Sequence, residues 1–400
     1  MKKKILFVIN TMGGAGAEMA MLEMMRCLKP SDYELNLFVL TNQGELIRRL
    51  PDYVKLLNNN MSDESVLSKE GKRHLKRYVF RAMFSHASVF RNIPYLIKNT
   101  GIMLGKRKLL IEKLLWRVLS DGAPRFTEHY DMAIAYLEGG SAYYVADHVE
   151  ADCKVGFVHI DYELAGYGPS LDKGVYDTYR QIYTVSDEVR KKFLQVYPQY
   201  EKKTGVFHNI INQDTIREKA KLPGGFSDSF AGKRILTVGR LTEQKAYEVA
   251  VEAMHLLKND GESVRWYVVG EGQERERLEK LIQKYGLEED FILLGMKDNP
   301  YPYYAQTDLY VHATRYEGKS IAIQEAQTLG CTILVSDCSG NREQIEDGVD
   351  GRMCELSPEG IRDGVRELLH DEAACKRYAA KAAEKRLGGE EDLQRLLSLL

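Results

Sequence analysis

Short runs of apolar residues recur along the chain, and stretches with helical spacing separate them. In the first half these runs lie at residues 4–9, 34–40, 130–136, 154–160, 181–186 and 203–208. Continuously apolar runs of this length are typical of strands that are buried on both faces. Because parallel strands need a crossover between them, the pattern predicts a parallel sheet that is covered by helices.

The same rhythm starts again after a breaker-rich stretch, KLPGGFSDSFAGK, at residues 221–233. Apolar runs then follow at residues 234–239, 264–270, 291–295, 309–314 and 332–337, with a helical pattern at residues 273–286. We therefore predict two doubly wound α/β domains, at residues 1–207 and 208–385, and a C-terminal helix at residues 386–400 that packs back toward the first domain. A cleft between two such domains is the natural place for an active site.

Composition gives no strong bias toward any class of partner. The net charge of the 400 residues is −2, so nothing indicates a nucleic acid ligand. The six cysteines form no C-x-x-C pair and no zinc-like spacing with histidine, so we expect reduced thiols and no metal site. Because no stretch approaches the roughly 18 consecutive apolar residues of a membrane-spanning helix, a cytoplasmic protein is predicted.

Residues 68–118 differ from the rest of the chain in charge. They contain thirteen Lys or Arg and only two acids, and Leu, Phe, Ile and Trp116 are interleaved with the cations. A segment of this kind favours an anionic membrane surface, on the inner face of the cell membrane. The alternative is a solvated helical face that folds onto the acidic remainder of the chain.

Two glutamates, Glu317 and Glu325, bracket the sequence EGKSIAIQE, which follows an expected strand. Ser320 suits a helix N-cap and Gly330 suits the end of that helix. The start of such a helix offers unpaired N–H groups to an anion. The two carboxylates are too far apart for the close pair of a retaining glycosidase. They fit one ligand that is held at two hydroxyl-bearing ends.

Two cations, Arg240 and Lys245, follow the first expected strand of the second domain. At the carboxyl end of a strand they can offset the charge of a diphosphate without a metal. Gly14 lies in a glycine-rich turn, NTMGGAGAE, that lets a ligand approach the backbone. This turn lacks the G-x-G-x-x-G spacing, as does VVGEGQER, which argues against a dinucleotide-dependent oxidoreductase but leaves it as an alternative.

Six motifs together give the chain a resemblance to a known family. The motifs are GGAGAE, VGRL with a lysine four residues on, VVGEG, LLG, YEGKSIAIQEA and SGNREQIEDGVDG. They resemble the retaining glycosyltransferases of family GT4, in the same order over nearly the whole chain. YDMAIAYLEG and VHIDY are similar to segments of bacterial enzymes that build surface polysaccharides or glycolipids. The resemblance implies the GT-B fold, in which two Rossmann-like domains face each other across a cleft.

The resemblance also implies roles for individual residues. Glu325 would hold the ribose hydroxyls of a nucleotide sugar, and Glu317 would hold hydroxyls of the transferred sugar. Arg240 and Lys245 match the pair that binds the diphosphate. His159 matches a histidine that reaches the sugar from the first domain. The donor-binding set is completed by the backbones of Ser320 and Ile321 and by Gly14 and Gly295.

The activity that the resemblance implies is retaining transfer of a hexose or N-acetylhexosamine. The donor would be a nucleotide-diphosphate sugar, with UDP favoured, and the acceptor a glycan or a lipid-linked glycan. No metal and no cofactor would be required. Ala246 stands where the family usually has glycine, and Lys319 and Ser320 replace the more common Phe-Gly. A non-catalytic relative that assists another transferase at the membrane remains the second alternative.

Overall fold

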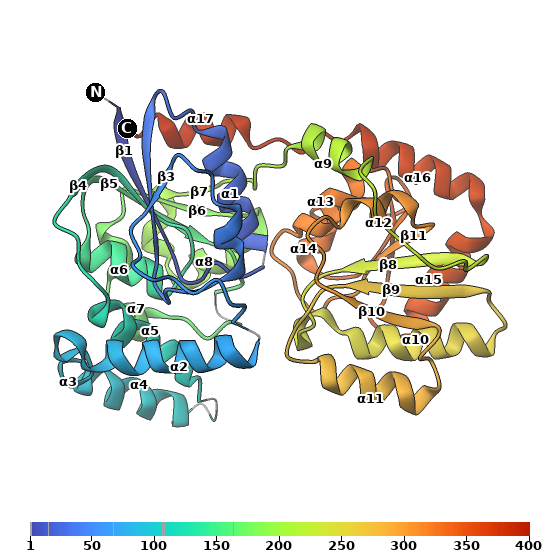
Figure 1. Ribbon diagram of the computed structural model, residues 1–400, viewed down its shortest axis with the longest axis horizontal. Helices are drawn as coiled ribbons and strands as arrows, with labels where there is room; N and C mark the ends of the chain where they lie inside the picture. Colours follow the sequence, from blue (N-terminus) through green and yellow to red (C-terminus); the bar gives the residue numbers. More distant parts are fainter. Residues whose placement is uncertain (1, 15, 67, 106, 108, 163) are drawn as a thin grey trace. The chain divides into compact units, whose positions relative to one another are not determined.

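Two parallel sheets organise the computed structural model, which describes residues 2–14, 16–66, 68–105, 107, 109–162 and 164–400 (Figure 1). Unit 1 consists of Met1–Ile210 and Gly389–Leu400, and unit 2 is Ile211–Gly388. The first division therefore falls three residues after the position expected from the sequence. Each unit has one doubly wound sheet, which confirms the predicted α/β class.

The sheet of unit 1 has seven parallel strands in the order β3-β2-β1-β4-β5-β6-β7. The strands are β1 (Lys3–Ile9), β2 (Tyr33–Val39), β3 (Val54–Leu56), β4 (His129–Ala135), β5 (Glu150–Val158), β6 (Gln181–Thr184) and β7 (Thr204–Val206). Strand order reverses between β1 and β4. Such a topological switch point opens a crevice beyond the carboxyl ends of the strands.

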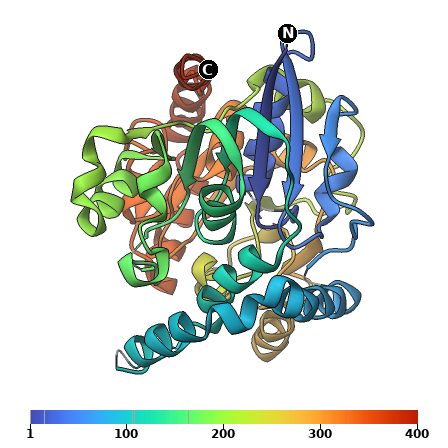
Figure 2. The ribbon, with the colours of Figure 1, turned by 90° about the vertical axis from the view of Figure 1, so that its left-hand side faces the viewer.

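The helices of unit 1 comprise those that cover the sheet and a further group that packs on them. Helices that belong to the sheet's crossovers and termini include α1 (Gly16–Cys27), α6 (Gly140–His148), α8 (Asp187–Val196) and α17 (Glu390–Leu397). The basic segment forms α2 (Lys69–Phe84), α3 (Ser88–Arg91), α4 (Ile93–Gly105) and α5 (Ile111–Gly122). Helices α2, α3 and α4 pack on α5, which packs on α6. In Figure 2 the helices of this segment, blue to cyan, lie at the bottom of the view.

Unit 2 has six parallel strands in the order β10-β9-β8-β11-β12-β13. They are β8 (Lys233–Val238), β9 (Val264–Val269), β10 (Phe291–Gly295), β11 (Leu309–His312), β12 (Ile333–Ser336) and β13 (Arg352–Cys354). The helices are α9 (Gln213–Ala220), α10 (Tyr247–Asn259), α11 (Arg275–Tyr285), α12 (Tyr301–Gln306), α13 (Ile321–Thr328), α14 (Ser339–Arg342), α15 (Pro358–His370) and α16 (Glu372–Glu384). Its switch point lies between β8 and β11.

Polar contacts attach the ends of both units. In unit 1, the main-chain N–H of His208 donates to Asp392 of α17 over 2.7 Å, and Arg395 donates to the Val206 carbonyl over 3.1 Å. In unit 2, the side-chain amide of Gln213 donates to the carbonyl of Lys385 over 3.1 Å and accepts from the N–H of Leu387 over 3.2 Å. Among the described residues, no helix is long and apolar enough to cross a membrane.

Candidate active site

The switch point of unit 2 brings together three ionisable side chains from different parts of the chain. Lys245 ends a short turn after β8, His312 is the last residue of β11, and Glu317 lies between β11 and α13. The Lys245 ammonium forms an ion pair with Oε2 of Glu317. Nε2 of His312 lies 3.1 Å from the Lys245 nitrogen and 3.2 Å from the same Glu317 oxygen. The structure thus pairs two predicted residues directly. A histidine that sequence analysis did not single out contacts both of them.

Burial and contact charges fix the protonation of this cluster. Burial raises the pKa of Glu317, but the Lys245 ammonium and the His312 hydrogen bond outweigh burial and hold the pKa at about 2. Burial and the same ammonium lower the pKa of His312 to about 4. At neutral pH the cluster therefore contains an ionised carboxylate and a neutral imidazole. Tyr310 hydrogen-bonds Nδ1 of the imidazole over 3.1 Å.

Arg240 lies two residues after β8 and its side chain is exposed. Its guanidinium has no hydrogen bond or ion pair with any residue that the structure describes. Two glycines shape the loop that carries it. A Cβ atom on Gly270 would lie 1.9 Å from the Gly239 carbonyl oxygen, and one on Gly272 would lie 2.1 Å from that of Leu241. The VVGEG motif is glycine-rich because its backbone packs directly on either side of Arg240.

Gly295 supports this arrangement from the end of β10. Its φ of 74° lies in the left-handed region that glycine favours. Its carbonyl oxygen accepts the N–H of Gly270 over 3.0 Å. Gly295 therefore helps to hold the VVGEG turn, and contact with a donor remains a prediction.

Glu325 lies in the buried part of α13. The hydroxyl of Tyr301 donates to its Oε1 over 3.2 Å, and that of Tyr304 donates to its Oε2 over 3.0 Å. Both tyrosines come from α12. Two phenols thus orient this carboxylate, which is 9% exposed. Its predicted role at a ribose is compatible with this geometry and stays a prediction.

The start of α13 is clamped by a glutamine. Ser320 is the N-cap, as predicted, and its side chain accepts the N–H of Ile323. The N–H of Ser320 donates to Oε1 of Gln344 over 2.6 Å, while Nε2 of Gln344 donates to the Ser320 carbonyl over 2.9 Å. The Ser320 N–H is therefore already engaged by the protein. Ile321, the first residue of α13, has no intrahelical partner for its N–H and keeps the predicted role.

A close backbone approach also positions Glu317. A Cβ atom on Gly340, in α14, would lie 2.3 Å from the carbonyl oxygen of Glu317. Only glycine lets α14 pack on this loop without a shift. The SGNREQIEDGVDG motif thus supports the site through Gly340 and Gln344, and neither residue had been assigned a role from the sequence.

In unit 1, His159 directly follows β5; the residue is half-buried and its Nε2 atom is buried. Burial lowers its pKa to about 4. Its main-chain N–H donates to Oε2 of Glu138 over 3.0 Å, which the sequence had not indicated. The N–H of Gly14 donates to Oε1 of Glu45 over 3.1 Å. These two predicted residues belong to unit 1, and their contact with a donor stays a prediction.

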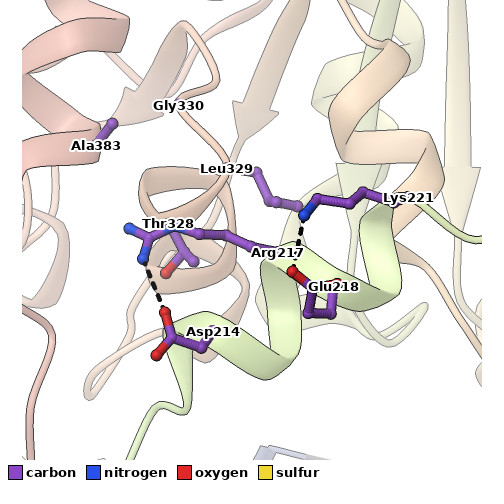
Figure 3. A pocket seen from close by; sticks show the side chains of 8 residues that line it. All are labelled: Asp214, Arg217, Glu218, Lys221, Thr328, Leu329, Gly330 and Ala383. Atoms are coloured by element: carbon purple, nitrogen blue, oxygen red, sulfur yellow. Dashed lines mark hydrogen bonds and ion pairs between the residues drawn. The ribbon is translucent and has the colours of Figure 1, made fainter.

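A surface pocket of about 480 Å³ lies elsewhere in unit 2 (Figure 3). It is formed by α9, the C-terminal end of α13 and α16, so it lies at the opposite end of α13 from Ser320. Arg217 pairs with Asp214 over 3.4 Å, and Lys221 pairs with Glu218 over 2.7 Å. The charges of the lining compensate each other, which does not suit a nucleotide diphosphate.

Comparison with known proteins finds a family model that matches most of unit 2. Residues 230–385 match the family model of the glycosyl transferases group 1. The match covers less than half of the chain. Arg240, Lys245, Glu317 and Glu325 all lie within the matched range. The charged switch point described above thus lies within the matched range.

Two relatives are similar over part of this chain. The 4-alpha-N-acetylgalactosaminyltransferase of Campylobacter jejuni that acts on N-acetylgalactosamine-N,N'-diacetylbacillosaminyl-diphospho-undecaprenol is 32% identical over 183 residues, 45% of this chain and 48% of the relative. The amylovoran biosynthesis glycosyltransferase AmsK of Erwinia amylovora is 32% identical over 144 residues, 34% of this chain and 35% of the relative. The chain is therefore matched to less than half the length of either relative.

A solved structure extends the comparison to both units. The structure of Anabaena HepE in complex with UDP and glucose is 15% identical, covers 99% of this chain and 98% of its own, and has a TM-score of 0.69. At this identity the similarity concerns the fold alone. The similarity confirms the predicted GT-B class in that the chain has two Rossmann-like domains, each with a parallel sheet.

Proposed function

We propose that this chain is a retaining glycosyltransferase that transfers a hexose or N-acetylhexosamine from a UDP-sugar. The main support is the cluster of Lys245, His312 and Glu317 at the switch point of unit 2. This cluster lies within the range that matches the glycosyl transferases group 1 model. The acceptor is a glycan or a lipid-linked glycan in surface polysaccharide or glycolipid synthesis. The names of the Campylobacter and Erwinia relatives support this class of acceptor. The match of unit 2 to a glycosyltransferase family model disfavours the oxidoreductase alternative.

The proposed mechanism rests on charge stabilisation. As the bond to the sugar breaks, negative charge develops on the departing UDP, and Arg240 and Lys245 stabilise it. The acceptor hydroxyl attacks from the same face and donates its proton to the leaving phosphate, so the anomeric configuration is kept. Glu317 is ionised and paired with Lys245, so it accepts hydrogen bonds from sugar hydroxyls. Glu325, oriented by two tyrosines, accepts those of the ribose.

Slow hydrolysis of candidate donors tests this proposal. The purified chain is incubated with UDP-glucose, UDP-galactose, their N-acetylated counterparts and GDP-mannose, and the released sugar is followed by NMR. We expect turnover of at least one UDP-sugar with the α-anomer released first. Release of the β-anomer contradicts the retaining mechanism. Absence of turnover and of UDP binding contradicts the function.

We further propose that no metal is required, because two cations stand at the expected diphosphate position. No group of three or more His, Cys, Asp or Glu side chains suited to a metal ion occurs in the described part of the chain. Turnover should persist in EDTA. Loss of turnover that Mg²⁺ or Mn²⁺ restores contradicts this proposal.

We also propose that unit 1 binds an anionic membrane surface through α2, α3 and α4, at the inner face of the cell membrane. Of the fifteen exposed large apolar side chains in the described residues, nine lie between Phe80 and Ile111. Exposed cations accompany them. These are Lys69, Lys72, Arg73, Lys76, Arg77, Arg81, Arg91, Lys98 and Arg107. Lys106 and Lys108, which were expected to take part, lie outside the described residues.

Helix α4 carries the apolar part of this argument. Its inner face packs Tyr95 and Met103 in a small buried cluster. Its outer face exposes Ile97 and Leu104, which are 70% and 60% exposed. A helix that is apolar on both faces at a protein surface is suited to the boundary between headgroups and acyl chains. The neighbouring cations then attract anionic headgroups, each by about 1 kcal/mol where it reaches them.

Co-sedimentation with vesicles tests the membrane proposal. Binding should require phosphatidylglycerol in phosphatidylcholine vesicles and weaken with added salt. Replacing Arg73, Lys76 and Arg77 with Gln should reduce it, as should Gln at Ile97 and Leu104. A matched control replaces Lys191, Lys192 and Lys202 with Gln, which removes the same charge elsewhere in unit 1. Equal loss in the control, or equal binding to neutral vesicles, contradicts the proposal.

A further inference from the structure

The carboxyl ends of three neighbouring strands in unit 1 form a second polar site. Asn10 directly follows β1, Glu138 lies three residues after β4, and His159 directly follows β5. Because β1, β4 and β5 are adjacent in the sheet, these residues meet at one edge, beside the topological switch point. Glu138 is 6% exposed, which is unusual for a carboxyl group that forms no ion pair with a described residue.

The backbone around Glu138 is fixed by hydrogen bonds and close packing. Nδ2 of Asn10 donates to the Glu138 carbonyl over 3.1 Å, and Oδ1 of Asn10 accepts the N–H of Ser141 over 2.7 Å. Gly139 has a φ of 75°, and a Cβ atom there would lie 2.6 Å from the Tyr167 hydroxyl. The position of the Glu138 side chain is therefore set by the fold and does not depend on a mobile loop.

Only one of the two carboxyl oxygens of Glu138 forms a hydrogen bond with a described residue. Its Oε2 accepts the main-chain N–H of His159 over 3.0 Å. Its Oε1 has no hydrogen bond with any residue that the structure describes. Nε2 of His159 is buried and is likewise without a partner among those residues. Because buried polar groups are almost always paired, the unpaired Nε2 of His159 calls for a ligand, and Oε1 of Glu138 offers a second free polar atom at the same strand edge.

The surroundings favour an uncharged ligand with hydroxyl groups. Burial raises the pKa of Glu138, and Lys113 of α5 is the cation whose charge opposes this rise. Lys113 lies over the Tyr167 ring, 4.4 Å from its centroid. The Lys113 ammonium also lies 3.4 Å from Glu112. It is thus partly compensated and does not form an ion pair with Glu138. A phosphate would meet a carboxyl group here without a dedicated cation, whereas a hydroxyl can hydrogen-bond both Glu138 and His159.

We propose that Glu138 is a sugar-binding residue, with Oε1 forming a hydrogen bond to a hydroxyl of a sugar that also reaches Nε2 of His159. This inference rests on the proposed glycosyltransferase function. Two sugars share the required chemistry, the one transferred from the donor and the one at the end of the acceptor. Separate measurements on donor and acceptor distinguish them.

The structural alternative is that Glu138 only holds the His159 backbone. Glu138→Gln separates the two roles, because an amide oxygen still accepts the His159 N–H while the other group becomes an NH₂ donor. Asp121→Asn is the matched control. Asp121 is another largely buried carboxyl of unit 1, and both of its oxygens are already used, by His148 over 2.8 Å and by Asn92 over 2.6 Å.

The test compares the wild-type chain and both variants in three measurements. Calorimetry gives the affinity for UDP, hydrolysis gives the KM for the UDP-sugar that is turned over, and transfer to p-nitrophenyl glycosides gives the KM for an acceptor. We expect Glu138→Gln to raise one KM about tenfold or more, as the loss of a hydrogen bond to a charged group does, with unchanged UDP affinity. A rise with the donor assigns the transferred sugar, and a rise with the glycoside assigns the acceptor.

Two outcomes overturn the inference without touching the proposed function. One is a Glu138→Gln variant whose melting temperature is unchanged and whose two KM values are within twofold of those of the wild type. The other is an equal KM increase in Asp121→Asn, which shows that loosening of unit 1 is the cause. Failure of the wild-type chain to bind UDP instead contradicts the proposed function, and the calorimetric measurement reveals this independently.

Discussion

The two switch points carry similar residues in different electrostatic settings. Each has a glutamate and a histidine at the carboxyl edge of its sheet. In unit 2, His312 ends β11 and Glu317 follows the same strand, whereas in unit 1 Glu138 follows β4 and His159 follows β5. Burial lowers the pKa of both histidines to about 4. The glutamates diverge. The pKa of Glu317 is lowered to about 2, whereas burial raises that of Glu138.

Lys245, together with the hydrogen bond from His312, accounts for this difference in pKa. Lys245 contacts Glu317 directly, and its charge outweighs the cost of burying the carboxylate. Glu138 receives a main-chain N–H and only a distant charge from Lys113. The same sheet architecture therefore gives unit 2 a site that is suited to a charged diphosphate and unit 1 a site that is suited to a neutral ligand.

Replacing Lys245 should remove the electrostatic difference between the two sites. We expect this substitution to have the largest effect on activity and stability. Lys245→Ala should lower kcat/KM. The loss of transition-state stabilisation should be about 3 kcal/mol or more, as for other electrostatic stabilisers. The substitution should also lower the free energy of unfolding by about 3 kcal/mol, because Glu317 is left buried without its cation. Urea denaturation and initial rates measure the two effects.

Arg240→Ala is the matched comparison for Lys245→Ala. Because Arg240 is exposed and forms no ion pair with a described residue, its loss should reduce the rate by a similar amount and leave stability nearly unchanged. A folded Lys245→Ala variant with a near-normal rate would remove Lys245 from the site.

The opposite shifts of the two glutamates can be measured directly. Carboxyl ¹³C NMR should show Glu317 titrating near pH 2, against an ordinary value of 4.5, and Glu138 titrating above 4.5. Glu317 then contributes stability that is present above about pH 4.5 and is lost as the pH falls toward 2. For Glu138 the sign is reversed, and its contribution declines as the pH rises through its folded pKa. Signals are assigned with Glu317→Gln and Glu138→Gln, and a shared titration midpoint would contradict the comparison.

Nucleotide binding should depend on unit 2 alone. Glu325→Ala should weaken UDP binding by about 1.5 to 3 kcal/mol, because two ribose hydroxyls lose an ionised acceptor. Tyr304→Phe removes one of the two phenols that orient Glu325, so its effect should be smaller and of the same sign. Calorimetry with UDP checks both variants. Unchanged affinity in Glu325→Ala would show that the carboxylate does not hold the ribose.

The smallest expected effect concerns the residue after Lys245. Ala246 has a φ of 45° and a ψ of 37°, a left-handed conformation that disfavours any side chain. Ala246→Gly should raise the free energy of unfolding by about 0.5 to 1 kcal/mol, since relief of strain exceeds the added entropy of the unfolded chain. Ala250→Gly, within α10, should lower it by about 1 kcal/mol. Loss of stability in Ala246→Gly would show that this turn is not strained.

Most of the fold follows from the sequence because the central strands are buried on both faces. Eleven runs predicted as strands correspond to strands in the structure, and the helix expected at 273–286 is α11. The two missed strands, β3 and β13, are three-residue edge strands, VKL and RMC. An edge strand needs no continuous apolar run, so periodicity does not reveal it.

The site was less predictable than the fold. Lys245 and Glu317 were each expected to bind a donor, but their contact joins residues 72 positions apart and depends on the pairing of β8 with β11. His312 and Glu138 are single polar residues within or next to apolar segments, and their roles are not evident until the sheet order shows which strand ends are neighbours. Gln344 lies in the polar SGNREQIEDGVDG motif, and only the structure shows its contact with Ser320. The common signal, a polar residue at the end of a buried strand, applies to His312 and His159.

The two hydrogen bonds of Gln213 have a consequence for protein engineering and for evolution. They hold the entry of unit 2 next to its exit, since one amide contacts both Lys385 and Leu387. Unit 2 is thus an insertion within unit 1 whose two ends meet at a single point of the chain. An insertion with adjoining ends can be exchanged as a cassette between related proteins without rethreading the host domain. Under the proposed function, such an exchange would replace the donor-binding unit and keep the rest of the chain.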